Sequence, residues 1–292
     1  MTEDGLTTEE ARYREALGQR IDGDQLAARD RFFAALHEGI FAWLDIMPGT
    51  AALDAGCGAG GCTVLLARDV GEGGSVAALD IAPALLETTR AHVEATPYAS
   101  RVAYYESDIT AVPFDDATFD LVWCSRVIHD LPDPLAGLRE LRRVLKPGGR
   151  LVMLEDIVPP RLLPFYVGLG RPGLEDRVNV AFSYRFAAFR RSLPGSVRYA
   201  VGWTQMLRDA GLADVSGRSF LFELMSPFTE SQEAYLLAHL RASLDRPRVL
   251  QRLDPKDQLT LQRLTDPEGP FYVFNRKDLH FIHVSTVYTG RA

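Results

Sequence analysis

The chain has 292 residues, of which 47% are hydrophobic and 24% are charged, as in a large globular domain or a domain with a sizeable insertion. Its net charge of −7 argues against a nucleic-acid or anionic-membrane partner, and no apolar run is long enough to span a bilayer. The three cysteines have no disulfide-framework spacing and the first ten residues, polar and acidic, do not resemble a signal peptide, so we expect a cytoplasmic protein.

Residues 1–47 are predicted to form a helical N-terminal arm. Thr7 or Thr8 is a candidate N-cap, followed by acids that suit the first turn of a helix. Further along, apolar residues recur at helical spacing: Leu26, Phe33, Leu36, Ile40 and Leu44. Pro48 and Gly49 then end the arm.

Strands and helices alternate from residue 48 to residue 156, which we take as the core of the protein. Apolar strands are expected within 50–55, 74–80, 101–110, 119–131 and 149–156, and helices within 61–70, 83–97 and 134–145. The glycines in the turn Pro147-Gly148-Gly149 would return the last helix to the sheet. Alternation with nearly continuous apolar strands predicts an α/β fold, a doubly wound, Rossmann-like and mostly parallel sheet.

The remainder of the chain is less regular. A helix and a strand are expected within 202–224, helices within 229–244 and 254–264, and an antiparallel C-terminal strand within 279–291. We predict that 157–202 and 226–278 are lid insertions. No convincing linker divides the chain, so the prediction is a single domain over residues 1–292.

A glycine-rich turn joins the first expected strand to its helix. Gly56, Gly58 and Gly60 allow a sharp turn and close approach of a ligand to the backbone, and the following helix N-terminus suits an anionic group. Asp54 precedes the turn, and Asp80 ends the second strand, where an acid can accept the hydroxyls of a ribose. The pattern therefore predicts a nucleoside-containing ligand.

A nicotinamide or flavin site would share part of this pattern. Gly61 fills the position that the G-x-G-x-x-G spacing of dinucleotide sites requires, so the glycines alone do not separate the two classes. Asp54 separates them better, because an acid is unfavourable beside a pyrophosphate and favourable beside a cationic group.

With these motifs the sequence resembles the class I S-adenosylmethionine-dependent methyltransferases, in their small-molecule branch with the ubiquinone and menaquinone methyltransferases. The matching features are "LDAGCGAGG", Asp80, Asp108 in "SDI", and "LRELRRVLKPGGRLVMLED". The resemblance is strong over about 50–156 and moderate over 203–225. It implies S-adenosyl-L-methionine as the cofactor.

The resemblance also implies roles for single residues. The methionine moiety would be held by Asp54, Gly56, Gly58 and Gly60, the ribose by Asp80, and the adenine by Ile81, Asp108 and Ile109. Ser125 and Arg126 would line the sulfonium end, and Tyr13 is a candidate lid contact. Alternatives stay open: Asp54 could cap a helix, and Asp115, Asp116 and Asp120 lie near Asp108.

His129 follows the fourth strand and is the candidate catalytic base, because an imidazole titrates near neutrality. The alternative is a histidine that packs or bonds the loop. No metal site is predicted, because the histidines and cysteines lack ligand spacing.

Aromatic residues in the insertions predict an apolar or aromatic acceptor. The candidate substrate-binding residues are Phe165, Tyr166, Phe182, Tyr184 and Tyr272, although aromatics at such spacing more often form a core. Nearby arginines are either solvated or receive an acidic group of the acceptor: Arg171, Arg177, Arg185, Arg190 and Arg191.

The leading hypothesis is a methyltransferase for a small molecule, plausibly in specialised metabolism, with no nucleic-acid partner. Two alternatives keep the fold: an enzyme that uses the cofactor for a cyclisation or rearrangement, and a cofactor-binding module without catalysis. A nicotinamide oxidoreductase is a more distant one. Oxygen, nitrogen and carbon acceptors stay open, as does a homodimer.

Overall fold

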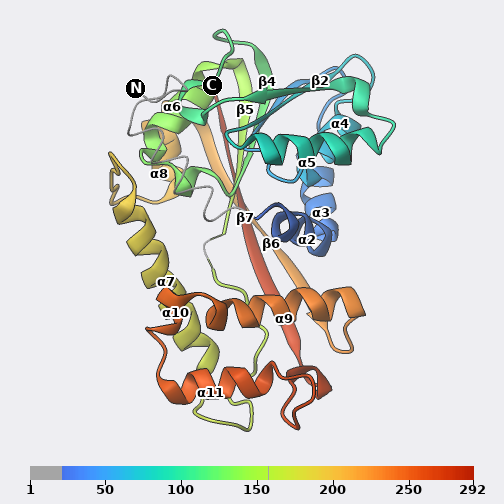
Figure 1. Cartoon of the computed structure of the whole chain (residues 1–292). Coiled ribbons are helices and arrows are strands. Elements are labelled where there is room, and N and C mark those ends of the chain that lie inside the picture. Colours follow the sequence, from blue (N-terminus) through green and yellow to red (C-terminus); the bar gives the residue numbers. More distant parts are fainter. Residues whose placement is uncertain (1–21, 157) are drawn as a thin grey trace. The chain divides into compact units, whose positions relative to one another are not determined.

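The computed structural model describes residues 22–156 and 158–292, which form two compact units (Figure 1). Of these residues, unit 1 holds 22–156, Leu193–Phe220 and Ser285–Ala292, and unit 2 holds 158–192 and Leu221–Val284. Unit 2 thus resembles the predicted insertions 157–202 and 226–278 but has different limits. The organisation as a single domain stays a prediction.

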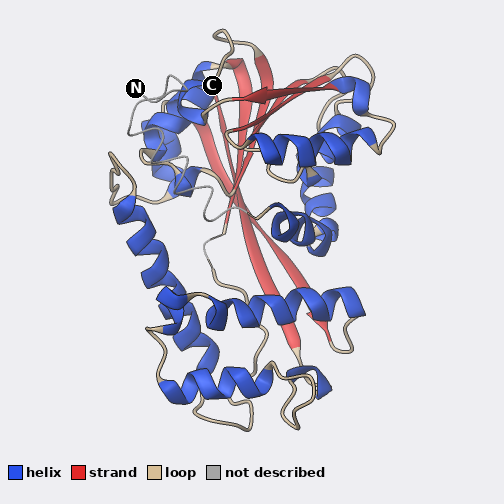
Figure 2. Ribbon diagram, in the orientation of Figure 1, coloured by secondary structure: helices blue, strands red, loops and turns tan. Residues whose placement is uncertain are grey.

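A seven-stranded sheet runs in the order β3-β2-β1-β4-β5-β7-β6 (Figure 2). Its strands are β1 (Ala51–Ala55), β2 (Ser75–Asp80), β3 (Val102–Glu106), β4 (Phe119–Ser125), β5 (Leu145–Glu155), β6 (Ala213–Met225) and β7 (His280–Arg291). The first five are parallel, and β7 is antiparallel to β5. The predicted fold class is confirmed.

The centre of the sheet in unit 1 is apolar, as its sequence predicted. Leu53 on β1 and Val122 and Trp123 on β4 are fully buried, which is typical of a parallel sheet covered on both faces. The helices of this unit are α2 (Gly23–Phe32), α3 (Ala34–Leu44), α4 (Gly61–Asp69), α5 (Pro83–Glu94), α6 (Pro134–Arg143) and α8 (Trp203–Asp209). Helix α4 contacts both α3 and α5, whereas α6 contacts α8.

Helix α6 and strand β5 correct one boundary. The helix begins at a side-chain cap, since Asp133 accepts hydrogen bonds from the amides of Leu135 and Ala136. It ends at Arg143, and β5 already begins at Leu145, so the expected turn at Gly148 lies within the strand. The reason is non-local: Leu145 pairs with Phe119 on β4, and the amide of Gly148 donates to the carbonyl of Ala292 at 2.9 Å, at the other end of the chain.

Unit 2 is mainly helical outside the ends of β6 and β7. Its helices are α7 (Leu174–Ser192), α9 (Glu230–Asp245), α10 (Pro247–Leu250) and α11 (Pro255–Leu264).

Four short 3₁₀ helices complete the described elements of the chain: Ala99–Arg101, Ile109–Ala111, Ile128–Asp130 and Val273–Asn275. The 19-residue helix α7 was not predicted, because arginines and aromatics obscure its apolar stripe.

Within α7 and α11, two buried carboxylates hold the unit together. Glu175 accepts hydrogen bonds from the amides of Leu162 and Leu163, at 2.9 and 3.2 Å. Asp257, only 1% exposed, accepts from the guanidinium groups of Arg171 and Arg177. Two of the arginines considered as acceptor ligands are therefore occupied by this aspartate.

The helical arm is present as α2 and α3 in the described residues, but the predicted contact Tyr13 lies outside them. Across residues 22–156 and 158–292, no helix combines the length and the apolar character that crossing a bilayer demands.

Candidate functional site

The glycine turn connects β1 to α4, and two of its glycines are needed for packing. A Cβ atom at Gly56 would lie 2.4 Å from Cγ2 of Val127, and one at Gly60 would lie 2.9 Å from Cα of Thr89. Gly58 is different, since the nearest atom to an added Cβ, on Leu26, is 3.7 Å away. All three have positive φ angles, which glycine adopts without strain.

Asp80 ends β2 and fixes this turn. Its carboxylate accepts hydrogen bonds from the amides of Gly58 and Ala82, each at 3.0 Å, and it is 6% exposed. Burial raises the pKa of Asp80, although its hydrogen bonds from Ala82, Gly58 and Ile81 oppose that shift. Ile81 follows on the same edge and is half-buried. A rigid carboxylate at this edge suits the hydroxyls of a ribose.

Asp54 lies at the end of β1 and is 1% exposed. It accepts a hydrogen bond of 2.6 Å from the hydroxyl of Thr63 on α4. Burial raises the pKa of Asp54 to about 7, against the Thr63 bond, and the charges of Asp80 and Asp30 add to the increase. Ionisation of Asp54 is therefore costly in the ligand-free protein. A cation bound beside the turn would favour the ionised carboxylate and would be attracted by it.

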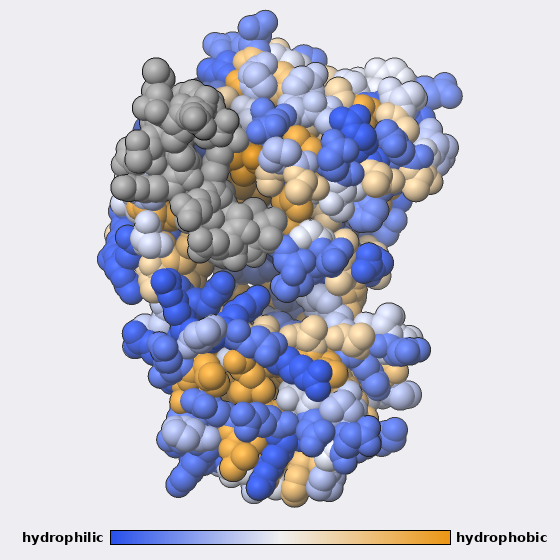
Figure 3. Space-filling view, viewed as in Figure 1, coloured by the Kyte–Doolittle hydropathy of each residue, from blue (hydrophilic) through white to orange (hydrophobic). Residues whose placement is uncertain are grey.

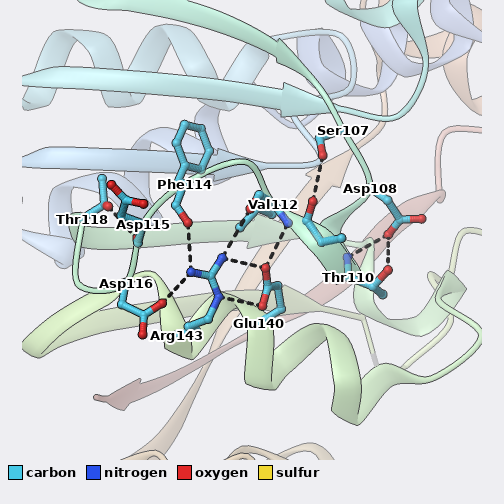
Figure 4. A network of polar contacts seen from close by, with 11 residues as sticks. Ser107, Asp108, Thr110, Val112, Phe114, Asp115, Asp116, Thr118, Glu140 and Arg143 are labelled. Atoms are coloured by element: carbon cyan, nitrogen blue, oxygen red, sulfur yellow. Dashed lines mark hydrogen bonds and ion pairs between the residues drawn. The ribbon is translucent and has the colours of Figure 1, made fainter.

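Asp108 begins a short 3₁₀ turn after β3. Its Oδ1 atom accepts from the amide and the hydroxyl of Thr110, both at 2.7 Å, as Figure 4 shows. Ile109 beside it is buried. Of the competing acids, Asp116 pairs with Arg143 and Asp120 pairs with Lys146, so both have structural partners.

Ser125 is the last residue of β4, and Arg126 follows the strand. Arg126 has a positive φ of 57° and a side chain that is 7% exposed. Its guanidinium group bonds the carboxylate of Asp156 at 2.5 Å and the hydroxyl of Ser285 at 3.1 Å. Burial opposes the charge of Arg126, but the carboxylate of Asp156 raises its pKa. Because its charge is compensated, Arg126 would repel a nearby sulfonium less than an unpaired guanidinium group.

His129 lies in the 3₁₀ turn after β4 and contacts the end of β5. Its Nδ1 atom is 2.7 Å from Oε2 of Glu155, a residue that is 2% exposed. Since an ionised carboxylate only accepts hydrogen bonds, we assign the proton to Nδ1 and the lone pair to Nε2. Asp130 lies 3.4 Å from Nε2. The carboxylates of Glu155 and Asp130 would therefore stabilise an imidazolium ion at this position.

Sequence reasoning missed three acids that belong to this region. Glu155 ends β5, the position in the topology that Asp80 has on β2, and Asp156 follows it; both acids were visible in "VMLED". Asp30 lies on α2, and its Oδ2 atom accepts from the amide of Gly61 at 3.1 Å. No local signal marked Asp30, because only the folding of the arm brings it to the turn.

These residues fit S-adenosylmethionine better than a dinucleotide. The donor set of a diphosphate site is made of amides and cations, whereas here the amides of Gly58 and Gly61 already donate to carboxylates. Three carboxyl groups lie at the turn, those of Asp30, Asp54 and Asp80, and burial raises the pKa of each. Such a site favours a ligand with positive charge.

The candidate substrate residues belong to unit 2, and most are accessible. Phe165, Tyr166 and Tyr184 are 73%, 53% and 52% exposed. Phe182 lies under the guanidinium group of Arg246, and Tyr272 packs edge-on against Phe274. Apolar and hydrophilic residues are interspersed on the face that Figure 3 draws. Their role in binding an acceptor stays a prediction.

A pocket of about 400 Å³ lies within unit 2. Tyr184, Val180 and Leu253 supply its apolar lining, and Arg171, Arg177 and Arg252 contribute charge. Arg252 stacks on the ring of Tyr184, with 4.6 Å between its Cζ atom and the ring centroid. Of the five candidate substrate residues, Tyr184 lines this pocket.

Metal ligands do not gather anywhere in the part of the chain that the structure describes. The three cysteines, Cys57, Cys62 and Cys124, are free and buried.

Comparisons with known proteins concern the part of the chain that contains the glycine turn. Residues 53–153 match the family model described as "Methyltransferase domain". The chain is 39% identical over 116 residues to a demethylmenaquinone methyltransferase from Shouchella clausii, covering 40% of this chain and 49% of the relative. It is 29% identical to the demethylmenaquinone methyltransferase of Bacillus mycoides, covering 61% of this chain and 76% of the relative. The chain therefore spans about half the length of the first of these curated relatives.

Solved structures support the fold alone. A protein of Bacillus halodurans C-125, provisionally named a methyltransferase, has a TM-score of 0.53 at 18% identity, with 87% of this chain and 97% of that chain covered. The YcgJ protein of Bacillus subtilis has the same TM-score at 16% identity, with 88% and 98% covered.

Proposed function

We propose that this chain, whose residues 53–153 belong to the class I S-adenosylmethionine-dependent methyltransferases, transfers a methyl group to a small, largely apolar or aromatic acceptor. The comparisons confirm the predicted family and, with it, S-adenosyl-L-methionine as the cofactor. The observation that carries the proposal is the carboxylate of Asp80, held by the amides of Gly58 and Ala82 beside the glycine turn.

In the proposed site each residue has one task. Asp80 accepts from the ribose, and Ile81, Asp108 and Ile109 contact the adenine. Ser125 and the compensated Arg126 line the sulfonium end. When bound, the cofactor supplies a methyl group that the sulfonium charge activates. The backbone of Gly58 has the open space that contact with the methionine moiety needs.

His129 is proposed to hold the proton that the acceptor loses. Glu155 fixes the ring through Nδ1, and Nε2, 3.4 Å from Asp130, is the ring atom proposed to take the proton from the acceptor. Glu155 and Asp130 then stabilise the resulting imidazolium ion. This arrangement suits an acceptor that must lose a proton on methylation, such as a neutral phenol or quinol methylated at oxygen or at a ring carbon.

An apolar, aromatic acceptor is supported by the exposed side chains of unit 2 and by the named activity of the relatives. Phe165, Tyr166, Phe182, Tyr184 and Tyr272 are proposed as its contacts, through their aromatic and apolar surface. We propose small-molecule metabolism in the cytoplasm as the setting, that of specialised metabolites, with no nucleic-acid partner.

The test has a binding arm and a turnover arm. S-adenosylmethionine and S-adenosylhomocysteine should raise the melting temperature, and nicotinamide dinucleotides should not. Turnover is then followed as formation of S-adenosylhomocysteine with a panel of phenols and quinols, including a reduced demethylmenaquinone. An Asp80→Ala variant should bind the cofactor about tenfold more weakly or worse.

The outcomes separate the alternatives. Stabilisation by a dinucleotide alone would refute the cofactor assignment. Consumption of an acceptor without formation of S-adenosylhomocysteine would indicate the cyclisation alternative. Cofactor binding with no turnover on any acceptor of the panel would favour the non-catalytic module.

A further inference from the structure

We propose that Asp30 on α2 binds the ammonium group of the cofactor's methionine moiety. This inference rests on the proposed function, and it assigns to the cofactor site a residue outside the matched segment 53–153. It also gives the N-terminal arm a direct part in binding.

Helix α2 lies against the glycine turn. It contacts both α4 and α5. Leu26 on α2 is the nearest neighbour of the open position at Gly58, at 3.7 Å from an added Cβ. One turn further along, Oδ2 of Asp30 accepts from the amide of Gly61, and a Cβ atom at Gly61 would lie 2.7 Å from that oxygen. The carboxylate of Asp30 is thus fixed at the start of α4.

Asp30 retains an oxygen with bonding capacity. Within the described chain, the bond from Gly61 is the one hydrogen bond that its carboxylate makes, and it forms no ion pair. The residue is half-buried, and burial raises its pKa, opposed by the charge of Arg29, the Gly61 bond and the charges of Arg126 and His92. An ionised carboxylate in this position is stabilised by a ligand that brings a positive charge.

The two other acids at the turn are less suited to this role. Asp54 is 1% exposed, with one oxygen engaged by Thr63. Both oxygens of Asp80 accept from backbone amides, those of Gly58 and Ala82. An ammonium group taken from water needs an acceptor that it can reach, since burying it without one is costly. Of the three carboxylates, Asp30 combines a fixed position, partial exposure and an oxygen without a hydrogen bond.

The experiment compares ligands that differ only in the methionine end. Calorimetry is run with S-adenosylhomocysteine, with its analogue lacking the amino group, and with 5′-methylthioadenosine, which lacks the amino-acid chain. The proteins are the wild type, Asp30→Asn and a control, Asp24→Asn, an exposed acid on the same helix.

For Asp30→Asn we expect affinity for S-adenosylhomocysteine to fall about tenfold or more, because the bond to a charged partner is lost. Affinity for 5′-methylthioadenosine should change by less than about twofold, and Asp24→Asn should behave as the wild type. In the wild type, the analogue without the amino group should bind about tenfold more weakly than S-adenosylhomocysteine.

Equal loss of affinity for both nucleosides in a folded Asp30→Asn protein would overturn the inference, as would an unchanged affinity for S-adenosylhomocysteine. If the variant does not fold, the wild type decides: equal binding of S-adenosylhomocysteine and its desamino analogue refutes the contact. Failure of the wild type to bind any adenosine ligand would refute the proposed function itself.

Discussion

Asp54 should make the ligand-free protein less stable as the pH rises. Its pKa in the folded chain is about 7, against 3.8 as the ordinary value. Because the folded pKa is raised, the stability from this group is fully present below pH 3.8 and is lost as the pH rises through 7. The shift of about three units, at about 1.4 kcal/mol each, corresponds to about 4 kcal/mol in total.

The perturbation is Asp54→Asn, which removes the ionisation and keeps an oxygen to accept from Thr63. Urea unfolding at about pH 5 and about pH 8 measures the effect, and about 2 to 3 kcal/mol of the total should be lost by the wild type across this interval. The free energy of unfolding of Asp54→Asn should not show this decrease between the two pH values. The exposed Asp24→Asn serves as the control and should follow the wild type.

Binding should respond in the opposite direction. A sulfonium ligand beside Asp54 favours the ionised carboxyl, so affinity for S-adenosylmethionine should rise with pH through 7 in the wild type and be flatter in Asp54→Asn. Parallel stability curves for the wild type and the variant between the two pH values would refute the reasoning, because the ionisation would then not be costly in the fold.

Other predictions concern packing, an ion pair and catalysis. Asp257→Asn should lower the free energy of unfolding of unit 2 by about 2 kcal/mol, because two arginines lose a buried carboxylate, whereas Asp254→Asn, at a more exposed site, should cost under about 0.5 kcal/mol. Gly56→Ala should destabilise by about 3 kcal/mol in chemical unfolding, against about 1 kcal/mol for Gly148→Ala, which has a similar positive φ and no neighbour for its Cβ. Equal costs for the two glycines would show that the clash at position 56 relaxes. Glu155→Gln should reduce kcat about tenfold or more, with little change in KM for the acceptor. A variant whose KM for the acceptor changes while its kcat stays at the wild-type value would contradict a role in proton transfer.

The sequence was informative where local pattern decides structure. Strands β1 to β5 were predicted because each apolar run is short and is bounded by turn residues or a helix. Asp80 was found because it ends the second predicted strand, downstream of the glycine turn. The same rule applied to Glu155 would have given the partner of His129, so that omission was avoidable.

Long-range contacts account for the other differences. The early start of β5 reflects the pairing of Leu145 with Phe119 on β4, which no local window contains. Asp30 reaches Gly61 only once α2 has packed against α4. Helix α7 has few buried residues, so its periodicity is weak. The hydrogen bonds that its Glu175 accepts from the amides of Leu162 and Leu163 are again tertiary contacts.

The preference for a cationic ligand follows from the way the turn is assembled. Asp30, Asp54 and Asp80 come from three elements, and burial raises the pKa of each. Their charges oppose one another, since those of Asp80 and Asp30 both raise the pKa of Asp54. A diphosphate would add negative charge to this set, whereas a sulfonium or an ammonium group would relieve the repulsion and favour ionisation. The same carboxylates that destabilise the ligand-free fold at neutral pH would therefore provide its selectivity between cofactors.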